Sequence, residues 1–344
     1  MGEINLMTFD KVMKNVNQYS TKHLLLGNGF SRACRNQLFA YDALFKEAEK
    51  HGLDDELKAV FAVLKTTDFE AVMRALRQCA ILVEQLANAT PLAKVMRSHA
   101  KKLRELLVKT IAGNHPARPS EIKKDEYAAC RSFLAPFDRV YTLNYDLLLY
   151  WTVMQDELEP KVETDDGFRQ PEKDPLEYVT WNVENSRDQR VFYLHGALHL
   201  FDAGHELQKY TWCNTGVALI DQIRTALEAE RYPLFVSEGS SKWKLNRIQH
   251  SGYLSRGFRS LSEIAGGIVV YGHSMAENDE HIIKLLESRK SKLKYVAVSL
   301  FGDPAKPSNQ HIIKRCSSLR AARKQQGNKV ELEFFDAASA EVWG

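Results

Sequence analysis

The chain has 344 residues, 44% of them hydrophobic, which is enough to bury a full core and long for one compact domain. Its 47 Lys and Arg residues against 44 Asp and Glu give a formal charge of only +3, without a long basic run, so a surface that binds nucleic acid is not expected. No apolar stretch approaches the ~20 residues of a membrane helix, no signal-like segment begins the chain, and the five cysteines contain no Cys-x-x-Cys pair, so we expect a cytoplasmic protein without disulfides or structural zinc.

The first predicted elements form a strand–turn–helix unit. Residues 23–27 are an apolar run that ends in Gly-Asn-Gly, and a pattern with helical spacing follows it. From Asp54 to Gly113 the apolar residues recur at helical spacing with little strand character. We interpret residues 54–113 as a helical insertion within a single domain that spans residues 1–344.

The alternation of strands and helices resumes after the insertion. A strand is expected at 139–143 and a helix at 146–151, and a polar segment, 156–190, is interpreted as a long loop over the site. Further strands are expected at 191–194, 234–236, 268–271, 295–300 and 330–335, and further helices near 215–230, 278–287 and 309–325. This alternation predicts an α/β fold with a doubly wound, mostly parallel sheet.

Four short polar motifs each follow a strand-like run. They are Gly27-Asn28-Gly29-Phe30-Ser31, Thr142-Leu143-Asn144-Tyr145-Asp146, His195-Gly196 and Gly272-His273-Ser274. The carboxyl ends of parallel strands lie along one edge of a sheet, so motifs that end different strands can converge on one crevice. The sequence therefore predicts a single site built from all four.

The glycine motif has two interpretations. Gly27 and Gly29 let the backbone turn tightly after a strand, and they can bring main-chain N–H groups close to a phosphate at a helix N-terminus. They can equally serve a purely structural turn. Neither a third glycine nor a Gly-Lys-Ser/Thr sequence follows, which argues against the usual dehydrogenase and kinase loops.

Three residues are candidates for catalysis. Asn144 can hold a water molecule or ribose hydroxyls in a fixed geometry, and His195 can accept a proton near neutral pH. Asp146 can stabilise developing positive charge, although it can also cap the next helix. His199, four residues after His195, does not complete a metal-ligand helix, so no metal is expected.

The remaining candidates are polar or small residues of the loops that follow the predicted strands. The expected nucleotide-binding residues are Gly27, Asn28, Gly29, Ser31, Tyr145, Ser237, Glu238, Gly272, Ser274 and Asp279.

The order of these motifs resembles that of the sirtuin-like NAD-binding superfamily, especially its bacterial branch in anti-phage defence. Residues 27–31 are similar to the Gly-Ala-Gly-x-Ser loop of that family, 142–146 to Thr-x-Asn-x-Asp, 195–196 to His-Gly and 272–274 to Gly-Thr-Ser. Asn28 replaces a small residue of the family loop, and the zinc-binding cysteine pairs of protein deacylases are missing. The missing zinc module argues against protein deacylation.

The resemblance implies a Rossmann-like fold and an NAD glycohydrolase that releases nicotinamide, with the diphosphate on residues 27–31 and the adenosine near Ser274 and Asp279. NAD would be the substrate, without a metal. The resemblance also implies a latent effector that forms a homo-oligomer or binds a partner protein from the same defence locus. The alternative that the sequence leaves open is a non-catalytic sensor of NAD or ADP-ribose, in which residues 54–113 relay occupancy of the site to a partner.

Overall fold

The structure, a computed structural model, describes residues 5–170, 178–211, 216–237 and 239–344. Its centre is a sheet of six strands, all paired in parallel, in the order β10-β9-β8-β1-β2-β5. The strands are β1 (Lys22–Leu26), β2 (Arg139–Thr142), β5 (Val191–Tyr193), β8 (Ala265–Tyr271), β9 (Lys292–Leu300) and β10 (Glu331–Asp336). Numbered along the chain from one to six, their spatial order is 3-2-1-4-5-6, which is the doubly wound order of dinucleotide-binding folds. The predicted fold class is confirmed.

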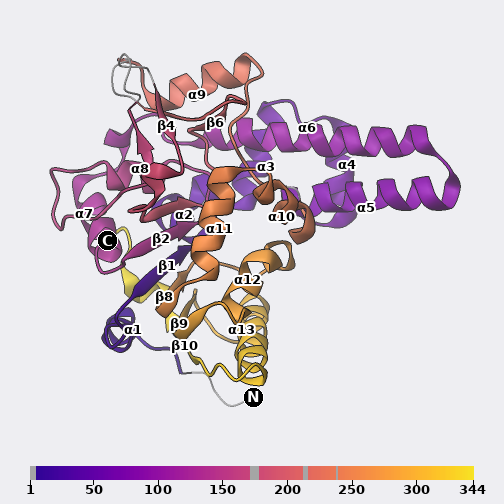
Figure 1. The fold of residues 1–344 in the computed structure, drawn as a ribbon. Coiled ribbons are helices and arrows are strands. Elements are labelled where there is room, and N and C mark those ends of the chain that lie inside the picture. Colours follow the sequence, from indigo (N-terminus) through magenta and orange to yellow (C-terminus); the bar gives the residue numbers. More distant parts are fainter. Residues whose placement is uncertain (1–4, 171–177, 212–215, 238) are drawn as a thin grey trace.

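Helices cover both faces of this sheet (Figure 1). Leu24 and Leu26 of β1 face one layer and Leu25 faces the other, as the two-residue period of a strand requires. The first layer contains α1 (Phe9–Val16), α2 (Gly29–Phe39), α7 (Lys124–Leu134) and α8 (Leu148–Val153), and the second contains α11 (Gly252–Ser262), α12 (Glu280–Glu287) and α13 (Pro307–Gln325). Because both faces are buried, the strands are nearly continuous apolar runs, which explains why their positions could be predicted.

The predicted insertion consists of helices. After α3 (Tyr41–Lys50) come α4 (Asp55–Leu64), α5 (Phe69–Ala87) and α6 (Thr90–Asn114). Asp54 and Asp68 cap α4 and α5 by accepting hydrogen bonds from backbone N–H groups of the first turn. Helices α5 and α6 form an antiparallel hairpin that extends away from the sheet (Figure 1).

A second, antiparallel sheet corrects the prediction of a long loop at 156–190. This segment contains β3 (Phe168–Arg169), β4 (Tyr178–Trp181) and the short helix η2 (Glu184–Ser186). The two strands pair with β7 (Leu207–Tyr210) and β6 (Leu200–Asp202) in the order β3-β4-β7-β6. The segment contacts Lys209 through Asp166 and the Tyr253 ring through Phe168. The loop prediction failed because these strands are short and one of their partners lies in a later hairpin, so no local alternation reveals them.

Two further expectations need correction. The predicted strand at 234–236 is reduced to an isolated antiparallel bridge between Gly196 and Phe235. The predicted helix at 215–230 is shorter, since α9 spans Leu219–Glu228. The other elements are α10 (Ser241–Gln249) and the short helices η1 (Pro119–Glu121), η3 (Glu277–Asp279) and η4 (Ala337–Ala340). Among the described helices, none combines the length and the apolar composition that a membrane span requires.

Candidate functional site

The turns after β1 and β8 pack backbone against backbone at the point where the strand order reverses. The Gly27 N–H donates to Tyr271 O at 2.9 Å, and the Gly29 N–H donates to Gly272 O at 2.8 Å. Gly272 has a φ of +68°, and a Cβ added there would lie 2.5 Å from Gly29 Cα. A side chain at Gly29 would likewise overlap the Gly272 backbone. Close packing of the two turns therefore accounts for these glycines, and the Gly29 amide is engaged with Gly272.

Three predicted residues meet beside this turn, in what we call the Ser31 cluster (Ser31, Asn144 and Asp146). Asn144 Nδ2 donates to Gly27 O at 3.1 Å and to Ser31 Oγ at 2.9 Å, and Ser31 Oγ donates to Asp146 Oδ2 at 2.5 Å. Asp146 Oδ1 accepts from the Leu148 N–H at 2.9 Å, so Asp146 caps α8 as one interpretation expected. These bonds tie the end of β2 to the start of α2.

Asp146 and Asn144 of the Ser31 cluster differ in whether their side-chain oxygens are already hydrogen-bonded. Burial raises the pKa of Asp146, and the hydrogen bonds from Ser31 and the Leu148 amide oppose that rise. Both carboxylate oxygens of Asp146 are engaged, which favours a positioning role for this residue. In contrast, no hydrogen bond from the described part of the chain reaches Asn144 Oδ1. Asn144 is therefore the member of this cluster with an acceptor to offer a ligand.

Tyr145 connects the Ser31 cluster to a second group of polar residues. Its ring stacks near His195, with ring centroids 6.4 Å apart. Its hydroxyl donates to Val236 O at 2.5 Å and lies 3.2 Å from Glu70 Oε1. Glu70 belongs to α5, so the helical insertion contributes a carboxylate to the site.

The second group is centred on Lys244 of α10, and we call it the Lys244 cluster. Its members come from six elements or the turns that follow them: Glu70, His195, Lys244, His273, Asp279 and His281. The side chain of Lys244 is 1% exposed, and its Nζ donates to Glu70 Oε2 at 2.6 Å and to Asp279 Oδ1 at 2.9 Å. Burial opposes the charge of Lys244, but the two carboxylates outweigh it and raise the Lys244 pKa.

The two carboxylates of this cluster have pKa shifts in opposite directions. Burial alone would raise the pKa of Asp279, but Lys244 and the hydrogen bond from His273 hold it well below its usual value. Burial raises the pKa of Glu70, and Lys244 opposes that rise. Glu70 also accepts a hydrogen bond from Asn278 Nδ2 at 2.5 Å. The donors around both residues fit ionised carboxylates.

The three histidines of the cluster are held in defined contacts. His273 Nδ1 accepts from the Met275 N–H at 3.1 Å, so its proton lies on Nε2, which donates to Asp279 Oδ2 at 3.3 Å. His195 Nε2 and His281 Nε2 are 3.0 Å apart, so one ring donates and the other accepts. Burial, with help from the Lys244 charge, lowers the pKa of His195 well below its usual value and that of His281 to about 3. Both rings are therefore neutral in the folded protein near neutral pH, and each has one ring nitrogen without a proton.

The possible metal ligands in the structure differ from the residue considered in the sequence. His199, the residue considered from the sequence, stacks against Tyr150 instead, whereas donor atoms of His195, Asp279 and His281 lie within 4.8 Å of one another. The Lys244 ammonium group binds the Asp279 oxygen that is 3.9 Å from His195 Nε2. It would repel a cation at that point, so this donor set does not fit a metal ion.

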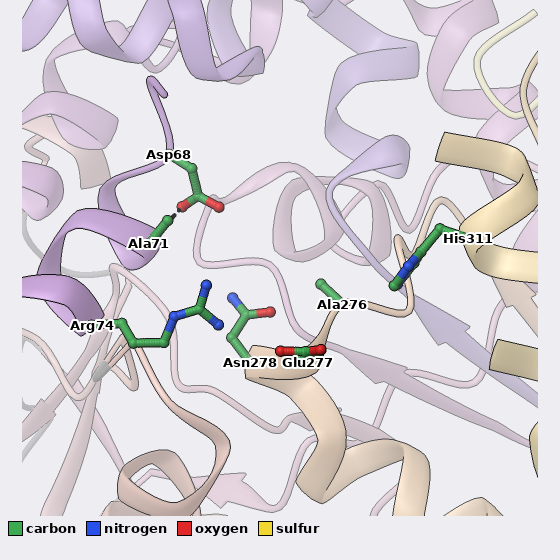
Figure 2. Close-up of a pocket in the computed structure, with 7 residues that line it drawn as sticks. All are labelled: Asp68, Ala71, Arg74, Ala276, Glu277, Asn278 and His311. Carbon is green, nitrogen blue, oxygen red and sulfur yellow. Dashed lines mark hydrogen bonds between the residues drawn. The ribbon is translucent and has the colours of Figure 1, made fainter. Parts of the chain in front are cut away.

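A cavity of about 190 Å³ adjoins the Lys244 cluster between α5 and the turn after β8. Figure 2 shows the Arg74 side chain reaching toward Asn278 across it, with Asp68 on one side and His311 on the other. Asn278 joins the cavity to the cluster through its bond to Glu70. His311, at the start of α13, donates to Met275 O at 3.1 Å.

The other predicted binding residues are scattered around this region. Asn28 Nδ2 donates to Phe39 O, which makes it part of the turn. Ser237 is fully buried, and its hydroxyl has no partner in the described ranges. Ser274 is exposed, and Glu238 lies outside the described residues.

The sequence did not point to Glu70 or Lys244. Both lie on helices where a charged side chain is ordinary, and they meet only because α5 and α10 approach each other across 174 residues of sequence. His273 lies within the predicted motif at 272–274 and His281 lies two residues after Asp279, but neither was proposed as a site residue.

The comparisons with known proteins bear on the whole site. The family described as "Domain of unknown function (DUF4917)" matches residues 24–343. The chain belongs to the DUF4917 family. The match includes every residue of the Ser31 and Lys244 clusters, so the site described above lies within the DUF4917 domain itself. No match is found among proteins of curated function.

Proposed function

We propose that this protein is an NAD glycohydrolase that cleaves NAD to nicotinamide and ADP-ribose. The observation that carries the proposal is the placement of Asn144 and His195 after the neighbouring strands β2 and β5 of a 3-2-1-4-5-6 sheet. In such sheets dinucleotides bind at the carboxyl edge, where the strand order reverses between β1 and β8. The resemblance of the motif order to sirtuin-like proteins supports the same substrate.

The charge of the site suits this reaction. The bond between nicotinamide and ribose breaks without a general acid because the leaving group is already cationic, and positive charge develops on the ribose in the transition state. With Glu70 and Asp279 ionised, the Lys244 cluster has two negative charges and one positive charge among neutral imidazoles. Its net negative charge would stabilise the ribosyl cation.

His195 would accept the proton that the reaction releases. As the C1′–N bond breaks, nicotinamide leaves with the bonding electrons and a water oxygen bonds to C1′. The oxygen of that bound water carries a positive charge and releases a proton readily, so the neutral His195 imidazole can take it even though burial lowers the His195 pKa. His281, 3.0 Å away, and Asp279, 3.9 Å away, would stabilise the resulting imidazolium.

Asn144 would orient the attacking water or a ribose hydroxyl. Its Nδ2 is fixed by Gly27 and Ser31, which leaves Oδ1 in a set direction as an acceptor. We expect Asn144→Ala to lose most NAD cleavage, because a misplaced water forfeits the orientation on which the attack depends. Steady-state rates of nicotinamide release measure this loss, and wild-type rates in a folded Asn144→Ala protein would remove Asn144 from the mechanism.

The described conformation would have to open before it binds a dinucleotide. The cavity has a volume of about 190 Å³, whereas ligand sites usually measure ~300–1,000 Å³. The contacts of Glu70 with Lys244 and Asn278 hold α5 against the turn after β8. We infer that α5 moves away from this turn when NAD enters, and that the closed form is the latent state of an effector that acts in anti-phage defence.

A non-catalytic sensor of NAD or ADP-ribose is the second candidate function. The observation that favours it is the burial of His195, which is 2% exposed. In this case the same loops would bind the nucleotide, and α5 would transmit its presence to a partner protein from the same locus.

Product analysis separates these functions. Purified protein is incubated with NAD, alone and with an acylated peptide, and the products are resolved by chromatography. We expect ADP-ribose and nicotinamide from NAD alone. Unchanged NAD together with calorimetric binding of ADP-ribose would establish the sensor instead, and turnover only in the presence of the peptide would identify a deacylase.

A further inference from the structure

The α5–α6 hairpin has an apolar face that no described part of the chain covers. The buried side chains of α5 include Met73, Leu76 and Ala80. Another row on the same helix has the spacing i, i+4, i+7, i+11 and consists of Ala75, Cys79, Leu82 and Leu86. Leu82 is 56% exposed and Leu86 is 82% exposed. This spacing is the one that helices use to pack against one another.

Helix α6 extends this face. Leu92, Val95, His99 and Lys102 follow one another at intervals of three or four residues, so they share one side of the helix. His99 and Lys102 pair with Glu56 and Asp54, which places the start of α4 on this side of α6. Beyond that point Leu92 and Val95 are 47% and 49% exposed. Helix α4 therefore covers the part of this face near the body and leaves the outer part open.

The open part of the face contains no charged group. Between residues 78 and 98 the charged side chains are Glu84, Lys94 and Arg97. Glu84 and Arg97 pair with each other across the hairpin, and helical spacing turns them and Lys94 away from Leu82, Leu92 and Val95. A partner selected by charge would find nothing to pair with here, whereas two identical copies could meet without like-charge repulsion.

We propose that this outer face, formed by Cys79, Leu82, Leu86, Leu92 and Val95, binds the same face of a second copy of the chain. The two hairpins would form a four-helix bundle around a twofold axis, with each copy contributing the same surface. The hairpin extends away from the sheet, so the copies can meet without the two sheets colliding (Figure 1). This inference does not depend on the proposed reaction with NAD.

Light scattering and sedimentation equilibrium of the full chain test the proposal. We expect a dimer with twice the monomer mass of 39.3 kDa. Leu82→Glu and Leu86→Glu would each place a charge in the apolar interface and weaken dimerisation by at least ~10-fold. Ile81→Glu is the matched control, because Ile81 is 45% exposed on the same helix but lies on a different side of it. Ile81 follows Arg77 by one turn, and Arg77 faces Trp243 of α10. Its dimerisation should equal that of the wild type.

Cross-linking gives a second readout of the same contact. Cys79 is an exposed free thiol within the proposed interface, so a short bismaleimide should join two copies, and Cys79→Ser should remove that product. Because the substituted side chains are exposed in the single chain, all variants should keep the wild-type melting temperature at concentrations where the protein is monomeric. A wild-type monomer at every concentration would overturn the proposal. The proposal would also be overturned if Leu82→Glu and Leu86→Glu had the same dimer dissociation constant as Ile81→Glu.

Discussion

The Ser31 and Lys244 clusters lie at the same edge of the sheet and are joined by Tyr145, yet they satisfy their polar groups in different ways. In the Ser31 cluster, hydrogen bonds run between side chains and the backbone of adjacent turns, and Asp146 is bonded at both oxygens. In the Lys244 cluster, a buried cation lies between two carboxylates, and neutral imidazoles face one another. The first arrangement fixes the geometry of the turns. The second arrangement holds buried charges and unprotonated imidazole nitrogens close together, and we expect the chemistry at such a cluster.

Removal of the central cation should have the largest effect on stability. Lys244→Met leaves Glu70 and Asp279 buried without a counter-charge, and we expect a loss of about 3–5 kcal/mol in the free energy of unfolding. Urea denaturation measures it. Lys242→Met, at an exposed position of the same helix, should change little, and adding Glu70→Gln to Lys244→Met should restore part of the loss. Equal stability of Lys244→Met and Lys242→Met would show that the Lys244 cluster does not hold α5 and α10 together.

The Ser31 cluster should respond less. Ser31→Ala removes the donor to Asp146 and the acceptor for Asn144, and we expect a loss of about 1–3 kcal/mol because two buried polar groups lose a partner. The same urea series measures it. If Ser31→Ala costs as much as Lys244→Met, the distinction between a neutral and a charged cluster fails.

The two clusters should also differ in their dependence on pH. Burial lowers the pKa of His195 and His281 in the folded state. Below pH ~6.5 these histidines therefore bind protons in the unfolded chain but stay neutral in the folded chain. Each of these histidines therefore supports stability above that pH, and the support is lost as the pH falls toward 4 at about 1.4 kcal/mol per unit. His23 and His115, with pKa values lowered to about 4, add to the same trend.

Asp146 should act in the opposite direction, because its raised pKa makes the folded state take up a proton first and gain stability as the pH falls. Urea midpoints at pH 7.5 and 5.5 check both signs. We expect a lower midpoint at pH 5.5, a smaller difference in His281→Gln and a larger one in Asp146→Asn. An unchanged wild-type midpoint would contradict the burial of neutral histidines.

The predictable part of the fold is the part with a local signature. The runs that became β1, β8 and β9 are apolar because helices cover both faces of the sheet, and the motifs after them could be placed on one edge without further information. Asn144, Asp146 and Ser31 indeed meet there. The antiparallel sheet was missed because β3 and β4 are short and β4 pairs with a later segment.

The rest of the site depends on how distant elements meet. Nothing in the sequence around Glu70 or Lys244 distinguishes them from solvated helix residues, and their roles follow from the approach of α5 to α10. At Gly29 the sequence was informative but ambiguous, because a phosphate loop and a close backbone contact both require glycine. The structure assigns it the contact with Gly272, so loss of NAD binding in Gly29→Val would not by itself establish a phosphate site.

The most direct test compares one member of each cluster in the same assay. Nicotinamide release from NAD is measured for His195→Ala and Ser31→Ala, with His23→Ala as a control for loss of a buried histidine outside the site. We predict that His195→Ala loses ~10²–10⁴-fold in turnover. Ser31→Ala, in which Gly27 O still holds Asn144, should lose less, and His23→Ala, corrected for its folded fraction, should stay close to the wild type. Wild-type turnover in His195→Ala, or an equal loss in all three variants, would contradict the assignment of the chemistry to the Lys244 cluster.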